Sequence, residues 1–211
     1  MRIALIHALR HSPPPIEAAF ARAWPEARLM NLLDDSLSAD LAAAGRLTPD
    51  MAARFLTLAR YAAGTGAAGI LFSCSAFGPC IEACARDLAP LPVLKPNEAA
   101  ITEALAHGQR IGLLATFPGT LASMPAEFPP GVTLVPALAE GAMAALDAGD
   151  GATHDRLAVA AAQGLADCDV ILLGQFSLAR AAAAVAEATG RPVVTTPDSA
   201  VRLLRAKLKA G

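Results

Sequence analysis

The chain has 211 residues, of which 55% are hydrophobic and 17% charged, so it is long and apolar enough to bury a substantial core. Its net charge of −2 and its pI near 6.1 leave no basic surplus for binding nucleic acid or an anionic membrane surface. We therefore expect a globular protein that binds neither nucleic acid nor a membrane.

Two apolar stretches resemble targeting or membrane segments only superficially. Residues 1–12 are charged on both sides of a short apolar run and lack a small-residue cleavage site, unlike a secretory signal. The uncharged stretch between Arg60 and Glu82 is long enough to cross a membrane, but several glycines and Pro79 interrupt it. The sequence therefore predicts a cytoplasmic protein.

Runs rich in leucine and β-branched residues recur along the chain and predict strands. The strongest runs cover residues 2–8, 68–76, 91–99, 110–116, 169–177 and 191–200, and weaker runs cover 27–33 and 132–138. Helical patterns lie at 48–64 and 153–167, and a basic amphipathic helix is predicted at 199–211. In the first of these helices, Thr48, Pro49 and Gly64 are typical N-cap, first-turn and C-terminal residues.

The strands form two similar sets. The matched segments are RIAL at 2–5 with RIGL at 110–113, ILF at 70–72 with ILL at 171–173, and PV at 92–93 with PV at 192–193. Continuous apolar strands that alternate with helices are typical of parallel sheets covered on both faces. The sequence therefore predicts an α/β fold of two pseudo-symmetric, doubly wound lobes, with the active site in the cleft between them. The predicted lobes are residues 1–95 plus 197–211, and residues 96–196.

Cys74 lies where the run at 68–76 changes from strand to loop. In open α/β folds, ligands bind beyond the carboxyl ends of the parallel strands, so this position favours a chemical role. The alternative is a small core residue, which is how free cysteines usually behave and how we interpret Cys80, Cys84 and Cys168. No zinc-type spacing, glycine-rich dinucleotide motif or P-loop is present in the sequence, so we expect no metal and no cofactor.

The segments CSAFG at 74–78 and GLLATFPGT at 112–120, on a duplicated α/β body, resemble the aspartate/glutamate/hydantoin racemase superfamily, which includes maleate isomerases and arylmalonate decarboxylases. The resemblance covers nearly the whole chain. It implies a homodimer that binds a small carboxylate between two lobes, each of which presents one cysteine. Cys74 is then the first thiol. The residues implied in substrate binding are Ser75, Ala76, Thr116, Gly119, Thr120, Phe176 and Ser177.

The second thiol that the resemblance implies is missing. Aligning ILFSCSA with ILLGQFS places Gln175 opposite Cys74, and an amide has no proton to exchange near neutral pH. Gln175 either donates a hydrogen bond to a carboxylate or an enediolate oxygen, or only fills space. His7, which follows the first strand, is the alternative acid–base group, against the simpler interpretation of a hydrogen-bonded loop residue.

These observations predict a cofactor-independent racemase or isomerase-like enzyme that acts at the carbon next to a carboxylate, with Cys74 as the acid–base thiol. Two alternatives remain open. One is a decarboxylase or other lyase of a small malonate-like acid that needs only one proton donor; the other is a non-catalytic carboxylate-binding homologue. For proton abstraction we expect backbone N–H groups after Cys74, where a helix is predicted to begin, to lower the pKa of the thiol.

Overall fold

The computed structural model describes residues 1–210 and divides into two compact units. The first comprises Met1–Pro96 with Ala200–Gly211, and the second comprises Asn97–Ser199. Gly211, which the sequence places at the end of the last helix and of the first lobe, lies outside the described residues. Among the described residues, no helix is both long and apolar enough to cross a membrane.

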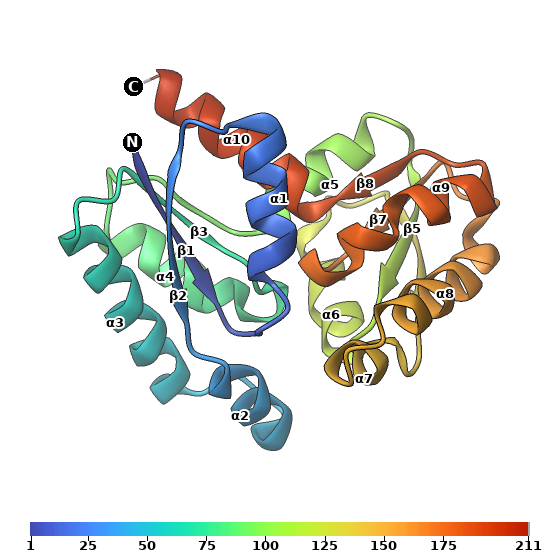
Figure 1. Ribbon diagram of the computed structural model, residues 1–211, viewed down its shortest axis with the longest axis horizontal. Coiled ribbons are helices and arrows are strands. Elements are labelled where there is room, and N and C mark those ends of the chain that lie inside the picture. The colour runs from blue at the N-terminus through green and yellow to red at the C-terminus, as the bar shows by residue number, and fades with distance from the viewer. Residues whose placement is uncertain (211) are drawn as a thin grey trace. The chain divides into compact units, whose positions relative to one another are not determined.

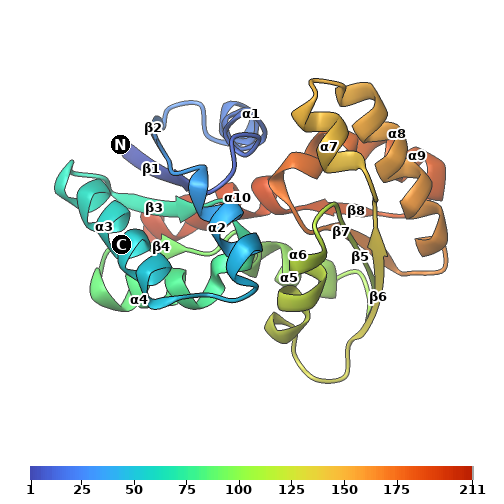
Figure 2. The same cartoon turned by 90° about the horizontal axis from the view of Figure 1, so that it is seen from below.

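The first unit contains a four-stranded parallel sheet with the order β2-β1-β3-β4. The strands are β1 (Arg2–His7), β2 (Arg28–Leu33), β3 (Gly69–Phe72) and β4 (Val93–Leu94). The helices associated with it are α1 (Pro13–Ala23), α2 (Ser36–Ala44), α3 (Pro49–Gly64) and α4 (Gly78–Asp87), and a short 3-10 helix, η1 (Ser75–Phe77), connects β3 to α4. Helices lie on both faces of the sheet (Figures 1 and 2), as the continuous apolar strands predict.

The second unit repeats this arrangement with the order β6-β5-β7-β8, again all parallel. Its strands are β5 (Arg110–Ala115), β6 (Thr133–Leu138), β7 (Val170–Leu173) and β8 (Val193–Thr195). Its helices are α5 (Glu98–Leu105), α6 (Pro118–Ser123), α7 (Ala142–Asp147), α8 (Gly151–Ala162) and α9 (Ala182–Thr189). The 3-10 helices are η2 (Met124–Glu127), η3 (Gln163–Leu165) and η4 (Phe176–Ala181), and α10 (Thr196–Ala210) crosses the division between the units. The α/β fold of two parallel-sheet lobes is confirmed.

Four strand predictions extend too far at their carboxyl ends. The runs at 68–76 and 169–177 form strands only to Phe72 and Leu173, and their last residues enter the 3-10 helices η1 and η4. The runs at 91–99 and 191–200 form only the short strands β4 and β8, and residues such as Asn97 and Asp198 then favour initiation of α5 and α10. The helix predicted at 153–167 begins earlier, at Gly151, because Asp150 caps it through the N–H of Thr153 at 2.9 Å.

Side chains from alternate strand positions enter different cores. In β7, Ile171 and Leu173 pack with the small residues of α8, whereas Val170 and Leu172 pack with α5 on the other face. This alternation explains why the strand is apolar at every position, since both faces are buried.

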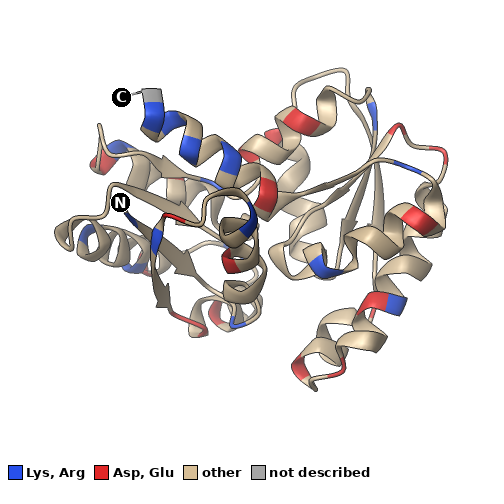
Figure 3. Ribbon diagram, turned by 45° about the horizontal axis from the view of Figure 1, so that its top comes forward, with Lys and Arg blue, Asp and Glu red and all other residues tan. Residues whose placement is uncertain are grey.

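The last helix carries a row of cations. Arg202, Arg205, Lys207 and Lys209 lie along α10, and the two lysines occupy its last turn (Figure 3). Cations stabilise the negative end of a helix. The apolar side of α10 packs on the sheet, where Leu204 and Leu208 approach Gly69 so closely that an added Cβ would lie 3.0 to 3.2 Å from them. The packing and the terminal cations together indicate a structural role for α10.

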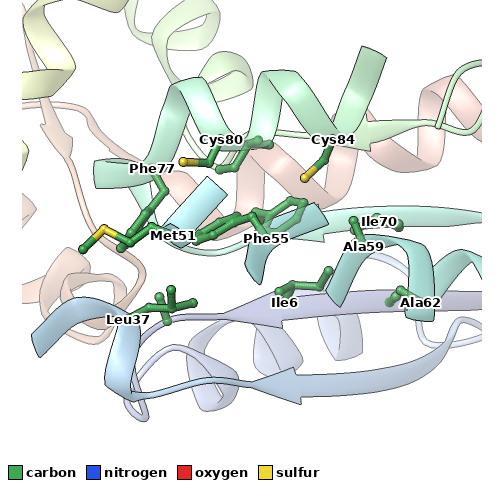
Figure 4. Close-up of a cluster of buried hydrophobic side chains, with 14 of the residues drawn as sticks. Ile6, Leu37, Met51, Phe55, Ala59, Ala62, Ile70, Phe77, Cys80 and Cys84 are labelled. Atoms are coloured by element: carbon green, nitrogen blue, oxygen red, sulfur yellow. The ribbon is translucent and has the colours of Figure 1, made fainter. Parts of the chain in front are cut away.

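An aromatic stack on α3 supports the end of β3. Phe55 stacks on Phe72 with ring centroids 5.2 Å apart and on Phe77 at 4.7 Å. Phe72 is the last residue of β3 and Phe77 the last of η1, so one side chain holds both ends of the segment that contains Cys74. Figure 4 shows Phe55 and Phe77 in this cluster, with Cys80 and Cys84 on its α4 side.

Phe55→Ala is expected to destabilise the protein by about 3 to 5 kcal/mol, because it leaves a cavity beneath both neighbouring rings. Tyr61→Ala, on the same helix but with 62% of the residue exposed, is the matched control and should change the free energy of unfolding by less than about 0.5 kcal/mol. Urea unfolding of the two variants measures the difference. Equal losses would contradict the importance of the stack.

Candidate active site

The carboxyl ends of β1 and β3 bring two polar residues together in the first unit. The N–H of Ser73 donates to the carbonyl of Ile6 at 3.0 Å, which continues the parallel ladder one residue beyond β3. This register places Ser73 beside His7, and Ser73 Oγ lies 2.8 Å from His7 Nδ1. Cys74 follows directly, so the thiol lies at the edge of the sheet where ligands of parallel α/β folds bind.

Cys74 differs from the other cysteines in its exposure. All four are free thiols, but Cys80, Cys84 and Cys168 are buried whereas Cys74 is partly exposed. Its backbone is extended, and η1 begins at the next residue. The backbone of Ala76 and the side chain of Ser38 on α2 are the polar groups that favour charge on its sulfur.

Burial raises the pKa of the Cys74 thiol to about 11, although the hydrogen bonds with Ala76 and Ser38 favour the thiolate. The expectation of a lowered pKa is therefore wrong. The Ala76 backbone does favour the thiolate, as predicted, but the loss of hydration raises the pKa by more than the two hydrogen-bonding groups lower it. At neutral pH the thiol holds its proton.

The two residues after Cys74 lie where the resemblance implies substrate binding. Ser75 is buried and Ala76 is partly exposed, and both belong to η1. Phe77, the last residue of η1, is fully buried against Phe55 and so fixes this turn on the core. The backbone of Ala76 also acts to lower the pKa of Cys74, against the larger opposing effect of burial.

His7 is buried, with both ring nitrogens occupied. Its Nε2 lies 2.9 Å from Asn31 Oδ1, and the amide nitrogen of Asn31 donates to Glu17 Oε1 at 2.6 Å. Because Asn31 presents its oxygen, Nε2 carries the ring proton and Nδ1 accepts from the Ser73 hydroxyl. Burial lowers the pKa of His7, against the smaller opposing effects of Asn31 and Glu17. This arrangement suits a neutral imidazole that orients Ser73.

In the second unit, the amide oxygen of Gln175 accepts from three donors. The backbone N–H and the hydroxyl of Thr116 lie 2.6 and 3.0 Å from Gln175 Oε1, and the N–H of Phe117 lies at 3.2 Å. Gln175 follows β7 and Thr116 follows β5, which are neighbouring parallel strands. With Oε1 held in this way, the amide NH₂ group is fixed as the end that can donate to a ligand.

The remaining predicted binding residues surround this cluster but differ in exposure. Thr120, Phe176 and Ser177 are each at most 2% exposed, and the hydroxyl of Ser177 has no protein partner. A Cβ on Gly119 would lie 2.4 Å from the ring of Phe117, so this glycine makes room for that ring. The methyl group of Thr120 packs near Gly174, directly before Gln175. The structure thus brings Thr116 and Gln175 into contact, whereas Thr120, Phe176 and Ser177 are buried.

Three residues around Cys74 and His7 were not predicted from the sequence. Ser38 favours charge on the thiol, Ser73 lies within hydrogen-bond distance of the histidine, and Asn31 on β2 continues that chain. The position of Ser73 next to Cys74 is a usable signal. Ser38 and Asn31 are recognisable only once the strand order is known. Among residues 1–210, no group of three or more His, Cys, Asp or Glu side chains is arranged to hold a metal ion.

Comparison with known proteins gives the same assignment for the fold. The sequence model of the Asp/Glu/hydantoin racemase family matches residues 14–204. The chain belongs to this family. No curated protein matches it in a sequence search.

Solved racemase structures share the fold of this family member at low sequence identity. Allantoin racemase from Klebsiella pneumoniae matches with a TM-score of 0.77 and 19% identity over 100% of this chain and 89% of its own. Aspartate racemase from Picrophilus torridus matches with a TM-score of 0.75 and 11% identity over 99% and 94%. A cysteine-for-glycine variant of arylmalonate decarboxylase, associated with sulfate, matches with a TM-score of 0.69 and 21% identity over 100% and 94%.

A pH test distinguishes a neutral, buried His7 from a freely titrating one. Since folding lowers its pKa, the unfolded chain takes up a proton below pH 6.5 that the folded protein does not, and stability falls as pH falls through that value. Between pH 7.5 and 5.5, wild type should therefore lose about 1 kcal/mol more than His7→Gln. Urea unfolding at both pH values measures this. The other titrating groups are common to both proteins, so an equal loss would contradict the assignment.

Proposed function

We propose that the protein is a cofactor-independent racemase or isomerase-like enzyme that transfers a proton at the carbon next to the carboxylate of a small amino acid or related acid. Cys74 is its acid–base thiol. The observation that carries this proposal is a partly exposed thiol just beyond the carboxyl end of β3, in a chain of the Asp/Glu/hydantoin racemase family. By the family resemblance, we also propose that the enzyme works as a homodimer.

The proton transfer depends on two states of Cys74. In the thiolate state the sulfur removes the proton from the α-carbon, and the electron pair moves into the adjacent carboxyl group as an enediolate. The thiol then returns a proton to the carbon. The Ala76 N–H and the Ser38 hydroxyl support the thiolate, while burial keeps it scarce at neutral pH. Because little thiolate is present at neutral pH, removal of the α-proton is the slow step. Return of a proton from the thiol to the carbon is the faster step.

Gln175 is proposed to act as a hydrogen-bond donor to the substrate carboxylate or to the enediolate oxygen. Support comes from the three donors that hold Oε1, because they leave only the NH₂ end of the amide for a ligand. A donor fixed before the reaction stabilises developing negative charge without first having to reorient. Gln175 does not supply a second exchangeable proton, so inversion with Cys74 alone requires the planar enediolate to turn its opposite face to the thiol before the proton returns.

Decarboxylation of a small malonate-like acid is the second candidate, and the raised pKa of Cys74 favours it. In that reaction the bond between the α-carbon and one carboxyl group breaks and carbon dioxide leaves with the electron pair retained on the α-carbon. The protonated thiol donates to that carbon, and solvent restores the thiol. This route needs one neutral acid and no second base.

Isotope exchange tests the proposal and separates the two reactions. Small amino and carboxylic acids are incubated with the protein in D₂O, and NMR follows both deuterium entry at the α-carbon and release of carbon dioxide. With a single thiol, exchange on one enantiomer should run faster than loss of optical rotation. Cys74→Ser should lower the rate of the active reaction at least about 100-fold.

The matched control is Cys80→Ala, which removes a buried thiol on α4 and should keep nearly the wild-type rate. If wild type catalyses neither exchange nor decarboxylation of any acid tried, both enzymatic candidates are contradicted. If Cys74→Ser then binds the same acid as tightly as wild type, the protein is a non-catalytic binding homologue.

A substitution tests the donor role of Gln175. Gln175→Glu keeps an oxygen for the three donors at Thr116 and Phe117 but replaces the NH₂ group with negative charge. The KM for a carboxylate substrate should rise at least about 10-fold, since a donated hydrogen bond becomes a charge repulsion. Steady-state kinetics measures this, and an unchanged urea midpoint shows that the cluster is intact. An unchanged KM would mean that Gln175 only fills space.

A further inference from the structure

The register of two neighbouring strands holds the hydroxyl of Ser73 against the ring of His7. His7 ends β1, and Ser73 follows β3 directly. Ile6 pairs with Phe72 in the parallel ladder, so the next residue on each strand lies beside the other, with both side chains on the same side of the sheet. Ser73 Oγ and His7 Nδ1 are 2.8 Å apart. A buried ladder therefore fixes this contact.

The direction of each hydrogen bond in this chain follows from Glu17 on α1. A carboxylate only accepts, so the NH₂ group of Asn31 faces Glu17 Oε1, at 2.6 Å, and the amide oxygen faces His7. That oxygen also only accepts, so His7 Nε2, at 2.9 Å, carries the ring proton. Nδ1 of the neutral ring is then a proton acceptor. The hydroxyl of Ser73 therefore donates to a base.

The nearest competing acceptor for this hydroxyl is farther away. The carbonyl oxygen of Ile6 lies 3.4 Å from Ser73 Oγ, against 2.8 Å for His7 Nδ1. A hydrogen bond weakens as its length increases, so the imidazole is the preferred acceptor. The O–H bond of Ser73 thus points along the path that its proton takes when the oxygen attacks an electrophile.

A hydroxyl, an imidazole and a third group that orients the imidazole are the parts by which enzymes activate a serine. The three side chains here are Ser73, His7 and Asn31, with contacts of 2.8 and 2.9 Å. Both distances lie within the range over which a base acts on a nucleophile. Asn31 sets the tautomer of the ring, and the base is therefore ready before any ligand binds.

Ser73 and Cys74 are adjacent in sequence but lie on different sides of the sheet. Phe72 and Cys74 both pack in the core cluster on the α3 side, and the backbone of Cys74 is extended. Side chains alternate along an extended chain, so Ser73 points to the other side, where His7 lies. The hydroxyl and the thiol therefore serve separate chemistry.

We propose that Ser73 is a nucleophile with His7 as its general base, and that this pair transfers the acyl group of small esters. Ser73 Oγ bonds to the carbonyl carbon while its proton moves to His7 Nδ1. The bond from that carbon to the leaving oxygen then breaks, and the alcohol takes the proton from the ring. Water, deprotonated by the same nitrogen, hydrolyses the acyl-serine and releases the acid. This activity goes beyond the proposed reaction of Cys74 and does not depend on it.

The exposure of the two side chains restricts the substrate. Ser73 is 6% exposed, whereas His7 is 1% exposed, so an ester reaches the hydroxyl and water does not reach the ring freely. A base that is screened from water keeps its hydrogen bond to the nucleophile. Small, unbranched acyl groups are therefore the expected substrates.

Labelling by diisopropyl fluorophosphate tests the nucleophile without an ester substrate. Ser73 Oγ bonds to phosphorus, fluoride leaves, and His7 takes the hydroxyl proton. Fragmentation mass spectrometry of the peptide that contains Ser73 and Ser75 locates the label. Ser75, at a similar 8% exposure, is the internal control, and Ser73 should react at least about 100-fold faster. Equal labelling of the two serines overturns the proposal.

Two variants connect the labelling to the histidine. His7→Gln should slow labelling of Ser73 at least about 100-fold, because an amide cannot take the proton. Cys80→Ala, which removes a buried thiol on α4, is the control and should stay within about 2-fold of wild type. Unchanged labelling in His7→Gln overturns the role of the base. If His7→Gln does not fold, the ratio of Ser73 to Ser75 labelling in wild type decides.

Hydrolysis of p-nitrophenyl acetate then tests the activity itself, through release of p-nitrophenolate. Wild type should hydrolyse the ester, and Ser73→Ala should lower the rate at least about 100-fold. A wild type that does not hydrolyse the ester overturns the proposal. An undiminished rate in Ser73→Ala also overturns it, and would assign the reaction to another group such as Cys74. Absence of exchange or decarboxylation at Cys74 leaves all these results unaffected, so the two proposals fail separately.

Discussion

The stacking of Phe55 between Phe72 and Phe77 is the packing interaction on which the candidate site depends. Phe72 ends β3, Phe77 ends η1, and the loop with Cys74 lies between them. The four residues between them, Ser73 to Ala76, have small side chains, and Cys74 and Ala76 pack against the core cluster that contains Phe55. The buried ring on α3 therefore helps to fix the conformation of the loop. Large side chains on either side of the loop therefore fix its conformation, and the small residues within it are available for substrate binding and proton transfer.

The two units have the same sheet order but different chemistry at equivalent strand ends. Beyond β3, the backbone of Ala76 and the side chain of Ser38 favour charge on a thiol. Beyond β7, an amide oxygen accepts from two backbone N–H groups and one hydroxyl. In both places the fold provides hydrogen-bond donors where a strand gives way to a turn. What differs is the group that uses them. A sulfur with a proton can exchange it, whereas an amide can only orient and donate.

The duplicated parallel fold is readable from the sequence because strands buried on both faces are apolar at every position, as in β7. Strand ends are harder to locate, since Asn97 and Thr196 follow apolar runs yet belong to helix starts. Cys74 could be identified because its neighbours in sequence are also its neighbours in space. Asn31 could not, because its contact with His7 requires β2 and β1 to lie side by side.

Burial of the Cys74 sulfur also affects its fate under oxidative stress. The thiolate and not the thiol attacks peroxides and disulfides, and a pKa of about 11 leaves very little thiolate at neutral pH. The other three cysteines are buried within their own cores, and all four are free thiols, so no resolving partner is bonded to Cys74. The environment that holds the proton on the sulfur is therefore also expected to slow oxidation of this thiol.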